Sequence, residues 1–115
     1  PATAVDLEAL CHAIGINRVS VVDPYDLKEV TRVLKEELAA EEPSVIISRR
    51  PCALLKYVKH NPPLSVDQDK CIGCKACLGI GCPAISYRNG KAVIDGTQCV
   101  GCGVCKALCP KGAIG

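Results

Sequence analysis

Eight of the ten cysteines in this 115-residue chain lie in its last third, in two runs of nearly the same spacing. The runs are C-x2-C-x2-C-x4-C-P and C-x2-C-x2-C-x3-C-P, at Cys71, Cys74, Cys77, Cys82 and at Cys99, Cys102, Cys105, Cys109. The second spacing is that of a [4Fe–4S] ligand run, and the first differs from it by one residue. Three thiolates at two-residue steps on a tight loop can bind three corners of a cubane. The sequence therefore predicts two [4Fe–4S] clusters.

The fourth cysteine of each run comes too late to reach the cluster held by the first three, so it is expected to ligate the other cluster. This exchange predicts two ligand sets, which are Cys71, Cys74, Cys77 and Cys109 for the first cluster and Cys99, Cys102, Cys105 and Cys82 for the second. The extra residue before Cys82 lengthens one crossover. Gly79 and Gly81 can absorb it by adopting positive φ.

Three other uses of paired cysteines fit the sequence less well. Zinc sites usually take their ligands in pairs, not three in a row at two-residue steps. Disulfides belong to oxidising compartments, and this sequence shows no signal-peptide pattern. A redox-active C-x-x-C of the thioredoxin kind is expected between a strand and a helix, a context that these cysteines lack.

Composition narrows the range of partners. The chain has no Met, Phe or Trp and only 3 Tyr, so its core is expected to consist of aliphatic side chains and inorganic clusters. The lack of aromatic stacking platforms argues against single-stranded nucleic acid as a partner. No apolar run approaches the length of a membrane span. We therefore expect a cytoplasmic protein with neither nucleic-acid nor membrane partners.

Charge is distributed unevenly along the chain. Residues 1–65 hold 9 acidic and 8 basic side chains, whereas residues 66–115 hold 3 acidic and 6 basic side chains. Free ferredoxins are typically acidic, and complementary charge raises the rate of encounter. The basic cysteine-rich region is therefore a candidate docking site for an acidic ferredoxin. The alternative is that these are ordinary solvated lysines.

Residues 1–48 follow an α-β-α-β pattern with parallel strands. A helix is expected over residues 3–15, with Thr3 in a capping box and Cys11 on its buried stripe. The β-branched segment 16–22 then predicts a strand.

A second helix is expected to begin after Asp26, with Glu29 at the capping-box position, and to end at Pro43. Its inward stripe is predicted to be Leu27, Val30, Leu34 and Leu38, with Glu36, Glu37, Glu41 and Glu42 facing solvent. The apolar segment 44–48 suits a parallel strand that is buried on both faces. Two strands cannot cover both of their own faces, so we expect a fragment of a larger α/β domain, or a docked partner. A start at Pro1 without Met fits a fragment or a processed product.

Residues 49–63 are expected to form a linker. Arg49 and Arg50 follow the last strand, where α/β sheets gather ligands, so they are candidates for binding a phosphate or carboxylate. The alternative is a solvated or interface pair of arginines. Cys52 and His60 have no companions at metal-ligand spacing, and we expect structural roles for them.

A small α+β domain with a ferredoxin-like fold is predicted over residues 64–115. It should contain a short strand at 64–66 and a hairpin over 85–94, because Asn89-Gly90 between alternating segments is a strong type I′ turn signal. The cysteine runs repeat with a 28-residue offset, which predicts pseudo-two-fold symmetry. The chain stops where a last strand would pair with 64–66, so we expect this end to be trimmed or poorly ordered.

Three features together resemble the alpha subunit of indolepyruvate:ferredoxin oxidoreductase. They are the sequence VVDPYDL at 21–27, the sequence RRPCAL at 49–54, and the four-residue gap before Cys82. The cysteine region itself resembles a bacterial-type 2[4Fe–4S] ferredoxin domain. The resemblance covers nearly the whole chain, but only the C-terminal end of that subunit.

The resemblance implies an oxidoreductase in which thiamine diphosphate with magnesium drives oxidative decarboxylation of an aryl 2-oxo acid. Coenzyme A takes the acyl group, and electrons pass through the clusters to ferredoxin. It also implies the remainder of the alpha subunit and a second, beta subunit as partners. The Gly-Asp-Gly…Asn thiamine motif is absent, so no catalytic or thiamine-binding residue is assigned and this piece alone is not expected to be catalytic. Two alternatives are a ferredoxin-like module of another redox complex and a zinc-stapled interaction module.

Overall fold

The structure, a computed structural model, describes residues 3–115 and divides into two compact units, Pro1–Arg50 and Pro51–Gly115. The predicted fold class is confirmed, since an α-β-α-β unit with parallel strands precedes a small unit with an antiparallel hairpin. No helix within the described residues has the length and apolar character required to cross a membrane.

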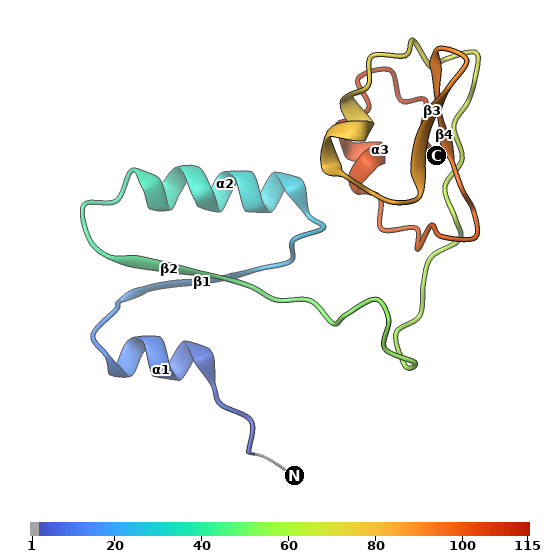
Figure 1. The fold of residues 1–115 in the computed structure, drawn as a ribbon. Coiled ribbons are helices and arrows are strands. Elements are labelled where there is room, and N and C mark those ends of the chain that lie inside the picture. The colour runs from blue at the N-terminus through green and yellow to red at the C-terminus, as the bar shows by residue number, and fades with distance from the viewer. Residues whose placement is uncertain (1–2) are drawn as a thin grey trace. The chain divides into compact units, whose positions relative to one another are not determined.

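The first unit is a two-stranded parallel sheet with a helix on each side (Figure 1). Its elements are α1 (Leu7–Ala13), β1 (Arg18–Val22), α2 (Leu27–Leu38) and β2 (Ser44–Ser48). The strands pair in register from Arg18 opposite Ser44 to Val22 opposite Ser48. The β-branched residues of both segments favour this extended pairing, as predicted.

Aspartate side chains cap both helices of the first unit. Asp26 caps α2 by accepting a hydrogen bond from the Glu29 N–H at 3.1 Å, as predicted. The prediction of a capping box at Thr3 is wrong, because the carboxylate of Asp6 accepts from the Ala9 N–H at 3.0 Å and α1 begins only after it. Asp6 has an extended backbone, which is the conformation of an N-cap residue.

The buried face of α2 differs from the predicted stripe. Val33 is buried, whereas Leu34 and Leu38 are 44% and 83% exposed. Glu37, predicted to face solvent, has a side chain only 8% exposed and accepts from the Arg18 Nε of β1 at 2.8 Å. The helix turns its glutamate toward the sheet because the half-buried guanidinium group requires a charged partner there.

Two further expectations for this unit are corrected. The second helix ends at Leu38 and not at Pro43, so residues 39–43 form a loop before β2. Cys11 is half-exposed and not buried, because α1 buries none of its residues within the described structure. The apolar stripe of α1 therefore remains largely open to solvent.

The second unit contains η1 (Ala76–Ile80), β3 (Ile85–Arg88), β4 (Lys91–Ile94) and α3 (Val104–Leu108). The hairpin is confirmed, and both residues of its turn have the positive φ that a type I′ turn requires, 50° at Asn89 and 79° at Gly90. The buried core consists of Cys77, Ala92, Cys105 and Ile114. Two of the four are predicted cluster ligands, so the core forms around the ligand loops.

The last residues of the chain pair with the segment that opens the cluster domain. The Ser65 backbone N–H donates to the Gly115 carbonyl at 2.9 Å, the Asp67 backbone N–H donates to the Ala113 carbonyl at 2.7 Å, and Val66 forms a β-bridge with Ile114. The expectation of a poorly ordered end is therefore wrong. Ile114 is 3% exposed, and its burial in the core holds this end in place.

The end of the predicted linker packs on the second cysteine loop. A Cβ atom added to Gly101 would meet the Pro62 carbonyl oxygen at 2.6 Å and the Asn61 carbonyl oxygen at 2.7 Å. The Asn61 side-chain amide also donates to the Gly101 carbonyl at 3.3 Å. Residues 61–62 thus form one wall of this loop.

We predict that Gly101→Ala destabilises the second unit, because φ is +67° there and a methyl group would strike the backbone of residues 61–62. The expected cost is about 1–3 kcal/mol, from the strained backbone alone. Gly79→Ala is the matched control, since its φ is not positive and nothing lies within 4 Å. Thermal unfolding of the cluster-loaded protein measures both, and equal melting temperatures would contradict the prediction.

Candidate iron–sulfur centres

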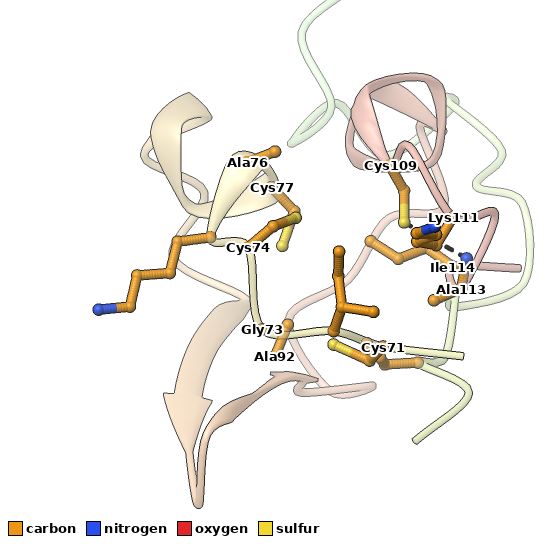
Figure 2. A pocket seen from close by; sticks show the side chains of 13 residues that line it. Cys71, Gly73, Cys74, Ala76, Cys77, Ala92, Cys109, Lys111, Ala113 and Ile114 are labelled. Carbon is orange, nitrogen blue, oxygen red and sulfur yellow. Dashed lines mark hydrogen bonds between the residues drawn. The ribbon is translucent and has the colours of Figure 1, made fainter. Parts of the chain in front are cut away.

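Four thiols from opposite ends of the cysteine-rich region share one cavity. Its volume is about 370 Å³, including its opening to solvent, and its lining contains Cys71, Cys74, Cys77 and Cys109. Figure 2 shows Cys109 facing Cys74 and Cys77 across the cavity. The first three come from the first run and the fourth from the end of the second. The structure therefore brings together the four residues predicted to ligate the first cluster.

The first loop turns its cysteines toward this cavity by alternating ligands with left-handed residues. Gly73 has a φ of +67° and Lys75 a φ of +63°, and η1 then places Cys77 in the core. Glycine adopts this conformation freely, but a residue with a side chain loses about 1–2 kcal/mol in it. The strain at Lys75 is thus offset by the structure around the loop.

Cys109 reaches the first cavity from the C-terminal end of α3. It is the capping residue of that helix and has an extended backbone, with φ −77° and ψ 111°. The Ala113 N–H donates to its Sγ at 3.3 Å, which Figure 2 draws as a dashed line. A backbone N–H directed at a thiolate is a usual means of tuning a cluster.

The second loop repeats this conformation with the predicted 28-residue offset. Gly101 and Gly103 have φ values of +67° and +80°, and α3 buries Cys105 as η1 buries Cys77. The Leu64 N–H donates to the Sγ of Cys99 at 3.4 Å. These matching conformations are the local basis of the pseudo-two-fold symmetry.

Cys82, the predicted fourth ligand of the second cluster, is half-buried. It follows Gly81, whose φ of +67° accommodates the extra residue of this crossover. Gly79 does not share that role, since its φ is not positive. The place of Cys82 as a ligand of the second cluster therefore stays a prediction from the cysteine spacing.

The thiols differ in their electrostatic surroundings. Backbone N–H groups of Ala92 and Gly73, aided by the charge of Lys91, lower the pKa of Cys71 below its ordinary value. Burial raises the pKa of Cys77, and the neighbouring thiolates of its own cavity raise it further. The pKa of Cys105 is raised in the same way, by burial first and then by Cys102. Burial thus disfavours the thiolate form of Cys77 and of Cys105, a form that a positively charged metal would stabilise.

The first site suits a polynuclear cluster by its donor set. Four thiols surround one cavity, and thiolate sulfur is the donor that [4Fe–4S] clusters take. Across residues 3–115, no three His, Cys, Asp or Glu side chains are close enough to hold a single metal ion.

The two arginines after β2 bind carboxylates of their own unit. Arg49 lies 3.0 Å from Glu8, and Arg50 lies 2.5 Å from Asp23 with its guanidinium 4.1 Å from the ring of Tyr25. Both arginines therefore form ion pairs within their own unit and do not form a preformed site for an external anion. Cys52 and His60 are exposed.

Sequence analysis missed the contacts that the linker and the hairpin make with the loops. Asn61, whose side chain donates to Gly101, lies in the segment predicted to be a linker. Leu64, whose N–H donates to Cys99, lies in the segment predicted to be a short strand. Tyr87 of β3 lies under Lys75, with 4.8 Å between the ammonium nitrogen and the ring centroid. No local pattern predicts these contacts. The only signal was that the prolines at 62–63 would stiffen the approach to the domain.

Residues 63–110 match the family described as a 4Fe-4S dicluster domain, so this part of the chain is similar to iron–sulfur domains that hold two clusters. That description implies two [4Fe–4S] clusters.

Longer relatives extend the match to nearly the whole chain. The indolepyruvate oxidoreductase subunit IorA of Pyrococcus horikoshii is 41% identical over 122 residues, covering 98% of this chain and 19% of the relative. IorA of Thermococcus kodakarensis is 41% identical over 115 residues (92% and 18%), and IorA of Methanothermobacter marburgensis is 36% identical over 114 residues (98% and 18%). The chain is homologous to this subunit and spans about a fifth of the length of these relatives.

We predict that Cys109→Ala removes the first cluster, because its thiol faces Cys74 and Cys77 across their cavity. About half of the iron should be lost, since each cluster holds four irons. Cys82→Ala is the matched control and should remove the second cluster instead. Iron content and EPR of the reduced protein measure both. Loss of the cluster at Cys99, Cys102 and Cys105 in the Cys109 variant would refute the assignment.

Proposed function

We propose that this chain is the electron-relay end of a 2-oxoacid:ferredoxin oxidoreductase acting on aryl pyruvates such as indolepyruvate. The observation that carries the proposal is the cavity in which Cys109 joins the three cysteines of the other half. The dicluster match and the homology to IorA support the same conclusion. The electrons are proposed to pass to an acidic ferredoxin in the cytoplasm.

The proposed ligand sets are those expected from the spacing. They are Cys71, Cys74, Cys77 and Cys109 for the first cluster and Cys99, Cys102, Cys105 and Cys82 for the second. When bound, each cluster supplies a site for one electron at low potential. The chain's own part is to place the clusters and tune them. The N–H groups of Leu64 and Ala113 are directed at the sulfur atoms of Cys99 and Cys109. They would stabilise the reduced, more negative state of a bound cluster.

The first 48 residues are proposed to complete a larger α/β domain, with residues 49–63 as a linker and residues 64–115 as the cluster domain. The two-stranded sheet supports this, because a pair of strands is marginal alone. Exposed apolar residues on both helices, Leu7, Leu10, Ile14, Leu34 and Leu38, also require a cover. The remainder of the alpha subunit would supply that cover, together with thiamine diphosphate, magnesium and the site for coenzyme A and the 2-oxo acid. A beta subunit is proposed as a further partner.

A ferredoxin-like module in another redox complex is the second candidate, since the cysteine-rich unit would serve either role. The two differ in what reduces the clusters. The first requires a thiamine-dependent reaction in the same protein, and the second does not.

The test is reduction of ferredoxin by the full-length protein that contains this sequence, driven by indolepyruvate and coenzyme A. We expect ferredoxin reduction that depends on thiamine diphosphate and falls to background without it, because only the decarboxylation supplies electrons. Reduction of the clusters by dithionite in the same preparation is the control. Clusters that dithionite reduces, but that no aryl 2-oxo acid reduces, would favour the second candidate.

A further inference from the structure

The two cysteine loops have left-handed residues at matching positions but unequal exposure. In the first loop Ile72, Cys74, Lys75 and Ala76 are all exposed, and Ile72 is 61% exposed. Their counterparts 28 residues later, Val100, Cys102, Gly103 and Val104, are all half-buried. The loops differ in residue type at these positions and also in the segments that pack against them.

The linker contacts the second loop from within the same unit. The backbone of Asn61 and Pro62 lies against Gly101, and the Leu64 N–H reaches the Sγ of Cys99. The first loop has a neighbour too, because the hairpin turn touches Gly73 at the carbonyl of Gly90. The residues on either side of Gly73, Ile72 and Cys74, are nevertheless exposed. Within the second unit, the first loop is thus more open to solvent than the second.

Positive charge is concentrated on the accessible side. Lys75 and Lys111 line the first cavity, and the charge of Lys91 acts on Cys71. The second loop, residues 99–105, has no charged side chain. Among the described residues, none of these three lysines forms an ion pair with a carboxylate, whereas every arginine of the first unit does. Lys91 is half-buried and donates to the Gln68 carbonyl oxygen, so the charges of the exposed Lys75 and Lys111 are the two most open to a partner.

The backbone and a ring hold Lys75 at this rim. It occupies a left-handed position, with φ +63°, where the second loop has Gly103. Its ammonium group lies 4.8 Å from the centroid of the Tyr87 ring, and the Tyr87 hydroxyl lies 3.5 Å from the Gly73 carbonyl oxygen. A strained residue that keeps a charged side chain next to a ligand loop is a recognised mark of a functional surface.

We propose that the exit face of this unit, defined as Ile72, Lys75, Lys91 and Lys111, docks an acidic ferredoxin, so that electrons leave from the side of the first cluster. This inference rests on the proposed function and names the surface used for it. Carboxylates on the carrier would pair with the three lysines, and exposed Ile72 would supply a small apolar contact. Such a face suits a weak, transient redox complex. In each encounter one electron moves from this protein to the carrier, and no bond or proton changes place.

The test compares charge reversals on the two halves of the unit in the full-length, cluster-loaded protein. Lys75→Glu and Lys111→Glu alter the exit face. Lys106→Glu, on α3 of the second half, makes the same change of charge elsewhere and is the matched control. The probe is an oxidised acidic 2[4Fe–4S] ferredoxin. Its dissociation constant is measured at several salt concentrations, and carbodiimide cross-links are mapped by mass spectrometry.

Each exit-face variant should weaken ferredoxin binding about tenfold at low salt, and the gap should close as salt rises, as for electrostatically steered association. Lys106→Glu should change binding less than about twofold, since an exposed charge outside the docking face is largely screened by salt. Cross-links should map to Lys75 or Lys111. Lys75→Gln and Lys111→Gln, which only neutralise the charge, should give intermediate losses. Unchanged iron content and EPR spectra confirm that the variants keep their clusters.

Two results would overturn the inference alone. If wild-type protein reduces ferredoxin but Lys106→Glu weakens binding most, the carrier docks on the second half. If wild-type protein reduces ferredoxin and all variants bind ferredoxin equally well, the lysines of the exit face do not contact the carrier, and ferredoxin docks elsewhere. Failure of the proposed function looks different, because cluster-loaded wild-type protein would then neither bind nor reduce ferredoxin.

Discussion

The structure of the second unit depends on thiols from opposite ends of the cysteine-rich region meeting in one cavity. Cys109 lies 38 positions after Cys71, yet both line the same space with Cys74 and Cys77. A cluster bound there would tie the two halves together as a covalent cross-link does. This cross-link would compensate for the low stability that a small hydrophobic core provides. Two of the four buried residues of the core cluster are themselves cysteines. We therefore expect cluster binding and folding to be coupled in this unit.

Local signals predicted most of the elements of the fold. The Asn89-Gly90 turn and the Asp26 cap follow from short-range chemistry, and both are as expected. The prediction of the inward face of α2 was wrong, because that face depends on a contact between residues distant in sequence, Arg18 and Glu37. A hydrophobic stripe predicts the buried face only when its cover is present. Here the exposed leucines of α2 mark a surface that the described chain does not cover.

For the site, the cysteine spacing predicted which residues share the first cavity, because ligand geometry constrains sequence directly. It did not predict that the two loops would differ in exposure. Asn61 and Pro62 of the linker pack on Gly101 of the second loop, and the loops themselves differ where Lys75 corresponds to Gly103. The repeated motif thus gives two unlike sites through contacts and residues that the cysteine spacing does not specify. The first loop, which is the more exposed of the two, contains a lysine, Lys75, whereas the second loop contains none.

The central claim is that eight thiols hold two cubane clusters rather than two zinc ions. Iron and acid-labile sulfide analysis of anaerobically reconstituted protein, with EPR of the reduced form, tests it most directly. The account predicts about eight irons and eight sulfides per chain, with signals from two reduced clusters. Zinc without sulfide, or colourless and iron-free protein after full reconstitution, would contradict it.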